Sequence, residues 1–182
     1  MSKGPLFPAA LALVASAALT ALSGCAGYQV GSIKPTPMAS VRTLAVPTFK
    51  NETLEPRIEV LFANTLIKQI QQDGTYRIAD EKNADATLEC TIEEIERKPQ
   101  RSVRGNTLVT REYELDMRLR YRVIDTKTGR ELMGRTVSGQ THFFVSGSNA
   151  ITADVLQDER QALPLAMEEA AVRLVAQISE GW

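Results

Sequence analysis

A strict alternation of apolar and charged side chains between residues 113 and 123 constrains the fold of this chain more than any other feature. The apolar positions are Tyr113, Leu115, Met117, Leu119, Tyr121 and Val123. A helix would scatter these side chains around its axis, whereas a strand directs all of them to one face. The residues between them are acidic or basic, so the sequence predicts a strand with one face in the core and one charged face.

Other segments have the patterns expected for the remaining strands of a sheet. The expected strands occupy residues 41–47, 76–78, 88–92, 113–123 and about 131–145. We expect a polar turn at residues 49–53, a loop that includes residues 97–111, and a turn at residues 125–130 that joins the last two strands into a hairpin.

Two segments have the spacing of amphipathic helices. In residues 56–71 the apolar side chains recur every three or four residues, after a proline that suits a first helical turn. Residues 158–178 have an apolar stripe flanked by alanines, and Pro164 is expected to kink or delay this helix. The order of elements predicts an α+β fold, a two-layer sandwich with two helices on one face of a mostly antiparallel four- to five-stranded sheet.

The N-terminus has the composition of a bacterial lipoprotein signal peptide. Lys3 is the only early charge, an apolar run follows over residues 9–22, and small side chains precede Cys25. As a helix this run would span about 21 Å, less than the roughly 30 Å hydrocarbon core of a bilayer, which argues against a transmembrane anchor. We therefore expect residues 1–24 to be cleaved off.

The sequence Leu22-Ser23-Gly24-Cys25 resembles the bacterial lipobox, in which the cysteine thiol is diacylglycerated and signal peptidase II cuts before it. Two or three acyl chains, such as palmitate, would hold the protein on a membrane because each buried methylene contributes roughly 0.8 kcal/mol. Ala26 follows in place of the aspartate that is familiar as a signal for inner-membrane retention. The outer membrane is therefore the expected location.

We expect the mature chain to consist of two parts. Residues 25–40, the lipidated cysteine and a small, polar, proline-bearing stretch, form a flexible tether, and residues 41–182 form a single domain. Cleavage removes one lysine and no acid, so the net charge of −1 becomes −2 and bulk nucleic-acid binding is not expected. With Cys25 acylated, Cys90 has no disulfide partner in the chain and is expected to be buried.

The sequence offers little for catalysis or metal binding. Its one histidine, His142, lies in a predicted strand beside two phenylalanines, where histidine is usually structural. No Ser-His-acid arrangement, glycine-rich phosphate loop or Cys/His metal spacing is present. We expect a protein that is not an enzyme and that carries no cofactor, only the acyl chains on Cys25.

Basic residues gather on and beside the alternating strand. Arg118, Arg120 and Arg122 share its charged face at intervals of about 7 Å, and the preceding loop has no acidic residue between Arg97 and Arg111. Guanidinium groups suit phosphate and carboxylate oxygens, so the cluster is a candidate site for lipid head-group phosphate or acidic barrel loops. The alternative is a solvated face that nearby acidic residues neutralise. The candidate residues are Arg97, Lys98, Arg101, Arg104, Arg111, Arg118, Arg120 and Arg122.

Short motifs, in order along the chain, are typical of one family of envelope lipoproteins. They are Gly27-Tyr28-Gln29-Val30-Gly31 after Cys25, Leu-Ala-Val-Pro-Thr-Phe-Lys-Asn-Glu-Thr at 44–53, Glu55-Pro56, Ala84-Asp85-Ala86-Thr87-Leu88 and the closing alanine-rich helix. Each motif is weak alone. Together with the lipobox they cover nearly the whole mature chain and resemble the lipopolysaccharide-assembly lipoproteins of the LptE family.

The resemblance implies a role at the outer membrane. Members of the family have two helices on a four-stranded sheet and sit largely inside the lumen of a large β-barrel, the LptD-type translocon. There they act as a plug, assist barrel assembly and contact lipopolysaccharide during its insertion into the outer leaflet. The implied partners are thus that barrel and lipopolysaccharide, with no nucleic acid. An alternative resemblance of residues 46–53 is to lipoproteins with TolB N-terminal or CsgG-like domains, which are secretion-pore or synthase-activator modules.

Overall fold

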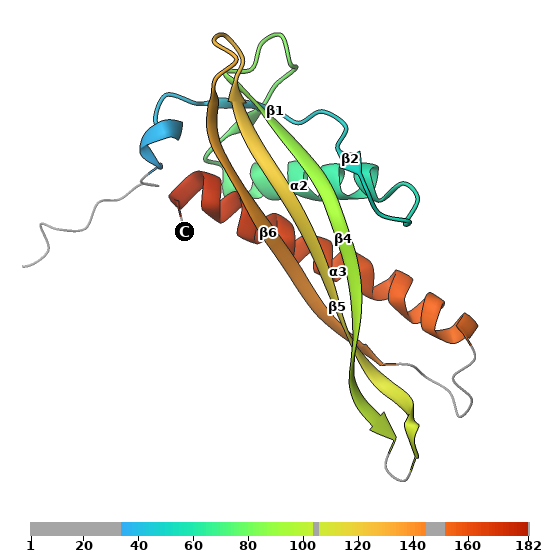
Figure 1. Cartoon of the computed structure of the whole chain (residues 1–182). Helices are drawn as coiled ribbons and strands as arrows, with labels where there is room; N and C mark the ends of the chain where they lie inside the picture. The colour runs from blue at the N-terminus through green and yellow to red at the C-terminus, as the bar shows by residue number, and fades with distance from the viewer. Residues whose placement is uncertain (1–33, 104–105, 145–151, 182) are drawn as a thin grey trace, which may run out of the picture. The chain divides into compact units, whose positions relative to one another are not determined.

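The computed structural model describes residues 34–103, 106–144 and 152–181. Its main feature is a mixed six-stranded sheet with the order β3-β1-β4-β5-β6, in which β2 also pairs with β4. Strands β4, β5 and β6 form an antiparallel meander, and the three short strands run parallel to their partners (Figure 1). The strands are β1 (Thr43–Ala45), β2 (Lys50–Asn51), β3 (Arg77–Ile78), β4 (Ala86–Val103), β5 (Asn106–Asp125) and β6 (Glu131–Phe144).

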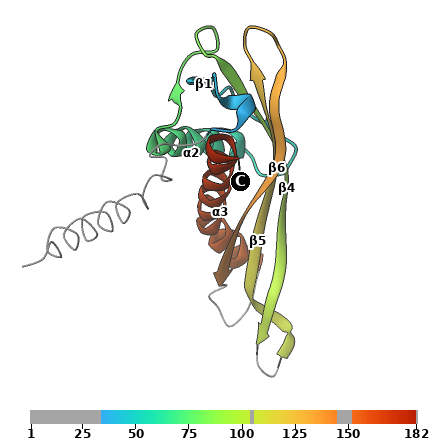
Figure 2. The same cartoon turned by 90° about the vertical axis from the view of Figure 1, so that its left-hand side faces the viewer.

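Two helices, α2 (Ile58–Asp73) and α3 (Thr152–Glu180), cover one face of the sheet (Figure 2). This arrangement confirms the predicted two-layer α+β fold with a mostly antiparallel sheet. The sheet has one strand more than predicted, because residues 49–53, expected to be a turn, contain the two-residue strand β2. In the part of the chain that the structure describes, no helix is both long and apolar enough to cross a membrane.

The alternation that predicted β5 also determines which face of the sheet is covered. Its apolar residues from Leu115 to Val123 are fully buried, and β4 adds Leu88, Cys90 and Ile92 to the same core. The predicted apolar face of α2 is largely correct, with Leu61 as an exception that is half exposed. The helix residues buried against the sheet include Ile58, Phe62, Leu66 and Ile70 from α2, and Met167, Ala170, Leu174 and Ile178 from α3.

Cys90 is buried, as predicted, and it is the free cysteine of the described residues. Loss of solvent around the thiol raises its pKa to about 12. The group is therefore a neutral thiol in the core, which is an unreactive state.

Small residues bring α3 very close to β6. A Cβ atom built at Gly139 would lie 2.0 Å from the backbone oxygen of Ala166 and 2.8 Å from the Cβ of Ala170. Real non-bonded contacts of this kind are not tolerated, so only glycine fits on the strand at this crossing. The alanines of the C-terminal segment thus provide the flat helix surface that this approach requires.

Helix α3 is longer than the sequence indicated. It begins at Thr152 rather than near residue 158, and it continues through Pro164. Proline in a helix interior removes one backbone hydrogen bond and leaves a carbonyl without its donor. Pro164 is exposed to solvent, so water can hydrate the backbone at this turn.

The loop predicted over residues 97–111 is wrong for most of its length. Strand β4 continues to Val103, and β5 begins at Asn106, so the two form one long hairpin. The ladder continues past the end of the apolar alternation at Tyr113, with Ser102 opposite Thr110 and Val103 opposite Asn106. Backbone pairing extends the hairpin where no apolar pattern marks it.

The last part of the predicted tether belongs to the fold. Thr36–Met38 form a short 3-10 helix, η2, and the Met38 side chain is fully buried. The Lys34 ammonium donates a hydrogen bond to the backbone oxygen of Val41 (2.7 Å) and lies 4.5 Å from the centre of the Tyr76 ring. The predicted flexible tether over residues 25–40 is therefore wrong for residues 34–40, because an apolar side chain pins this segment to the core.

Candidate ligand-binding face

The sheet face opposite the helices carries the predicted arginine row. Arg118, Arg120 and Arg122 alternate on β5 with the buried Leu119 and Tyr121. Their side chains are 53%, 57% and 52% exposed, respectively. No helix of the described residues covers this face (Figure 2), and we call it the open face.

Glutamates of β4 pair with all three arginines. Arg122 lies 2.7 Å from a carboxylate oxygen of Glu89, and Arg120 lies 3.1 Å from Glu93. Arg118 contacts Glu94, with Glu93 nearby. A bulge at Glu93 interrupts the β4 register, and the side chains of Glu93 and of its neighbour Glu94 both contact arginines of the open face. The open face is therefore a ladder of opposite charges rather than a bare positive surface.

The sequence did not lead us to predict these glutamate partners. Acidic residues of β5 itself were the expected neutralisers, because the register between the strands was not known. The alternation of residues 88–92 could have predicted that Glu89 is on the open face, because it puts Glu89 and Thr91 on the side opposite the core. An antiparallel pairing with β5 then sets Glu89 opposite Arg122.

Arg97 and Lys98 lie on β4 and point to opposite faces. The Arg97 guanidinium lies 2.6 Å from a carboxylate oxygen of Glu159, a buried residue of α3, so Arg97 is on the helix side of the sheet. Lys98 is on the open face and lies 3.0 Å from Asp116 and 3.4 Å from Glu96. Its hydrogen bond to Asp116 raises the pKa of the Lys98 ammonium. The structure therefore does not bring these two residues together.

Two of the remaining candidates, Arg101 and Arg111, lie toward the far end of the hairpin. Arg101 is in β4 and pairs by backbone register with Glu112, while Arg111 is in β5. The side chains of Arg101 and Arg111, and the whole of Arg104, lie outside the described part of the structure. The role of all eight basic residues as ligands for an anion stays a prediction.

His142 lies on β6, as predicted, and its side chain is on the open face 3.6 Å from Glu114. Within the described residues no group of three or more histidine, cysteine or acidic side chains is placed to hold a metal ion.

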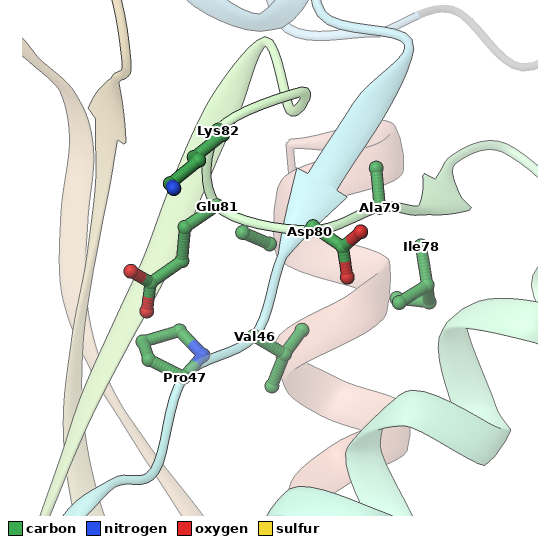
Figure 3. A pocket seen from close by; sticks show the side chains of 8 residues that line it. Val46, Pro47, Ile78, Ala79, Asp80, Glu81 and Lys82 are labelled. Atoms are coloured by element: carbon green, nitrogen blue, oxygen red, sulfur yellow. The ribbon is translucent and has the colours of Figure 1, made fainter.

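Two hollows lie near the ends of the short parallel strands. The larger, about 760 Å³, is lined by Val46 and Ile78 and by the loop residues Asp80, Glu81 and Lys82 (Figure 3). Its other lining residues are Ala45, Pro47 and Ala79, so an apolar wall faces a loop of mixed charge. The second, about 450 Å³, opens on the open face, and its lining combines three cationic residues and three threonines with Glu81 and Glu89.

The family model described as lipopolysaccharide-assembly, LptE, matches residues 41–178, which span the domain from before β1 nearly to the end of α3. This chain belongs to the LptE family. The match thus includes the whole sheet with its open face, all of α2 and nearly all of α3. No protein in a search of curated sequences matches the chain.

Solved structures with the same fold have little sequence in common with this LptE-family chain. PelC from Paraburkholderia phytofirmans, described as a dodecamer, is 16% identical with a TM-score of 0.51, and the match covers 84% of this chain and 97% of PelC. An uncharacterised lipoprotein B from Nitrosomonas europaea is 13% identical with a TM-score of 0.53, covering 84% and 90%. A DUF330 protein from Xanthomonas campestris is 13% identical with a TM-score of 0.54, covering 83% and 91%. At these identities the likeness shows the fold alone.

Proposed function

We propose that this LptE-family chain is an outer-membrane lipoprotein that plugs an LptD-type β-barrel, assists its assembly and helps to insert lipopolysaccharide into the outer leaflet. The observation that carries the proposal is the family match over residues 41–178, which covers the complete described sheet and both helices. The role is one of binding and positioning, without a catalytic step.

The N-terminal sequence supports the membrane location. Acylation of Cys25 after cleavage of residues 1–24 would attach the chain to the periplasmic side of the outer membrane. Residues 26–33 would then connect the lipid to the packed segment that begins at Lys34, a reach of at most about 30 Å for an extended chain.

The β4–β5 hairpin has the dimensions that a plug requires. Strand β4 has 18 residues, which corresponds to about 60 Å at roughly 3.3 Å per residue. A hydrocarbon core is roughly 30 Å thick, so the hairpin is long enough to follow the lumen of a barrel across it. The charged open face suits a polar lumen better than it would suit lipid.

Affinity purification of the native protein after crosslinking in cells tests this proposal. We expect one large β-barrel of the LptD type to be recovered with the protein in a 1:1 ratio. Recovery of a peptidoglycan synthase, or of a homo-oligomeric ring, would contradict it. The dodecamer described for PelC makes the ring a concrete alternative for this fold, and the native mass of the purified complex separates the two. A matched Cys25→Ser variant shows whether barrel recovery depends on the anchor or on the domain.

A further inference from the structure

One transverse row of the sheet aligns two cations and a hydroxyl group. Lys50 of β2 pairs with Thr91 of β4, and Thr91 in turn pairs with Arg120 of β5. Neighbouring strands are about 4.8 Å apart, so Lys50 and Arg120 start from backbone positions roughly 10 Å apart, with the threonine between them.

The Lys50 side chain points to the open face. Its neighbour Phe49 is buried in the core, and Asn51 donates hydrogen bonds to the Glu55 backbone oxygen (2.8 Å) and to the carboxylate of Glu59 in α2 (3.0 Å). Lys50 is exposed and lines the same 450 Å³ hollow as Arg120. We call this space the Lys50 hollow.

Hydroxyl groups and cations dominate the walls of the Lys50 hollow. They come from Lys50, Arg120, Arg122, Thr48, Thr87 and Thr91. Threonine hydroxyls and ammonium or guanidinium groups all donate hydrogen bonds to an anion. These donors lie on three adjacent strands and on the segment before β2, so together they offer hydrogen bonds to more than one oxygen of a phosphate group.

The charges of the hollow favour Lys50 as its primary anion contact. Arg120 and Arg122 are already paired with Glu93 and Glu89, respectively. No acidic side chain among the described residues forms an ion pair with Lys50. Glu81 and Glu89 also line the hollow and reduce its positive potential, so binding should be moderate and sensitive to salt.

We propose that the Lys50 hollow binds a phosphate group, with Lys50 as the main cationic contact, the Thr91 hydroxyl as a donor and Arg120 as the second cation. The source of the phosphate that fits the proposed function is the head group of a glycolipid, and this choice of source rests on that function. The site itself rests on the row and the hollow. It is separate from the basic end of the hairpin, because Lys50 pairs with β4 at Thr91 rather than near Val103.

Calorimetric titration of the mature lipidated protein in detergent tests the site. The probes are inorganic phosphate, glucosamine 1-phosphate and purified lipopolysaccharide, each at low and at physiological salt. For glucosamine 1-phosphate we expect Lys50→Ala to weaken binding about tenfold and Lys50→Arg to restore most of it. Glu89→Gln should strengthen binding about twofold to threefold, because it removes a negative charge from the wall of the hollow.

Lys68→Ala is the matched control, because Lys68 is an exposed lysine on α2, on the helix side of the sheet. The affinity of this variant for each probe should equal that of the unmodified protein. Equal losses in Lys50→Ala and Lys68→Ala, or no loss in Lys50→Ala with any probe, would overturn the site. A loss for glucosamine 1-phosphate and lipopolysaccharide together identifies the head group as ligand. A loss for inorganic phosphate alone keeps the site but overturns the glycolipid as its source.

The outcome is independent of the barrel experiment. If Lys50-dependent phosphate binding is found but no LptD-type barrel is recovered, the proposed function fails and the phosphate site stands. If the barrel is recovered and Lys50→Ala binds all three probes as tightly as the unmodified protein does, the phosphate site fails and the proposed function stands.

Discussion

At the scale of single residues, a tyrosine hydroxyl secures the end of α3. The Tyr76 hydroxyl donates a 2.5 Å hydrogen bond to the backbone oxygen of Ile178, one of the last carbonyls of the helix. Both residues are buried, so loss of the hydroxyl would leave a carbonyl without a partner and without water. We expect Tyr76→Phe to lower the free energy of unfolding by about 1–3 kcal/mol in urea denaturation.

Tyr121→Phe is the matched comparison. The Tyr121 hydroxyl binds the side-chain oxygen of Gln177 at 2.9 Å, and Gln177 is only partly buried, so water can replace the lost hydroxyl. The loss should be below about 1 kcal/mol. Equal losses in the two variants would show that the Ile178 carbonyl is not the reason for the effect.

Asp85 links the start of β4 to β1. Its carboxylate accepts hydrogen bonds from the Arg42 backbone N–H, from the Thr43 backbone N–H and from the Thr43 hydroxyl, each at 3.0 Å. The Arg42 backbone N–H and the Thr43 hydroxyl are the main causes that lower the pKa of Asp85. A lowered pKa in the folded state means that the carboxylate stabilises the fold above the unfolded pKa of about 3.9, and that this contribution is lost as pH falls through the folded pKa.

We therefore expect Asp85→Asn to lose about 1–2 kcal/mol of stability at pH 7, and the difference from the unmodified protein to narrow below about pH 4. Urea unfolding at a series of pH values measures both effects. Asp80→Asn, at an exposed position in the neighbouring loop, should change stability little at any pH. A deficit of Asp85→Asn that stayed constant down to pH 2 would argue against the charged hydrogen bonds.

The arginines of the open face show which side-chain properties can be predicted from the sequence and which cannot. Alternation alone placed Arg118, Arg120 and Arg122 on one exposed face, because side-chain direction in a strand depends only on parity. Their pairing with Glu89 and Glu93 depends on strand register, which is a non-local property. Lys50 was not a candidate, since its place beside Thr91 depends on a two-residue strand hidden in a predicted turn.

At the scale of whole elements, the contact between α3 and β6 depends on one glycine. A methyl group at Gly139 would overlap the backbone of α3 at Ala166 and Ala170. We expect Gly139→Ala to lower the free energy of unfolding by about 3 kcal/mol or more, because a helix backbone cannot move aside as a flexible side chain can. Thermal unfolding followed by circular dichroism measures the loss.

Gly134→Ala is the control on the same strand. The nearest atom to a Cβ at Gly134 is a carboxylate oxygen of Glu131, at 2.5 Å, and Glu131 is an exposed side chain that can turn away. Its effect should stay within about 1 kcal/mol. Similar losses at both glycines would mean that strand propensity, and not the helix contact, decides the result.

The expected strands at residues 41–47, 76–78 and about 131–145 are confirmed by β1, β3 and β6, whereas β2 and the far end of the β4–β5 hairpin were not predicted. The main segments of β5, α2 and α3 follow from their periodicity, because each buries one face against the core. The end of the β4–β5 hairpin has no such pattern, and backbone pairing such as Ser102 with Thr110 continues the two strands there. The continuation of α3 through Pro164 is a tertiary effect that overrides local propensity.

At the scale of the whole molecule, the folded domain begins before the first segment that its sequence pattern predicts. Met38 is buried and Lys34 is hydrogen-bonded to Val41, so the packed segment begins before residue 41, the expected start of the domain. From the sequence alone, one methionine in a stretch of small and polar residues does not show whether that stretch is flexible or packs against the core. Under the proposed acylation of Cys25, residues 26–33 alone would separate the lipid from this packed segment, which would limit the distance between the domain and the membrane.

We expect Cys25→Ser to abolish attachment of the acyl chains and to release the folded domain from lipid. A single serine cannot be diacylglycerated, and the acyl chains contribute the anchoring free energy at roughly 0.8 kcal/mol per buried methylene. Metabolic labelling with palmitate, followed by membrane fractionation, measures both attachment and location. Labelling of the unmodified protein should disappear in the variant, while its circular dichroism spectrum stays unchanged after refolding.

Cys90→Ala is the control, because Cys90 is the other cysteine of the chain and is buried in β4. It should keep full palmitate labelling and membrane location, with only a modest loss of stability from the missing sulfur atom. Labelling that persisted in Cys25→Ser and vanished in Cys90→Ala would contradict the lipobox interpretation. In that case the connection through residues 26–33 would no longer lead to a membrane anchor, and the proposed plug would need another means of reaching its barrel.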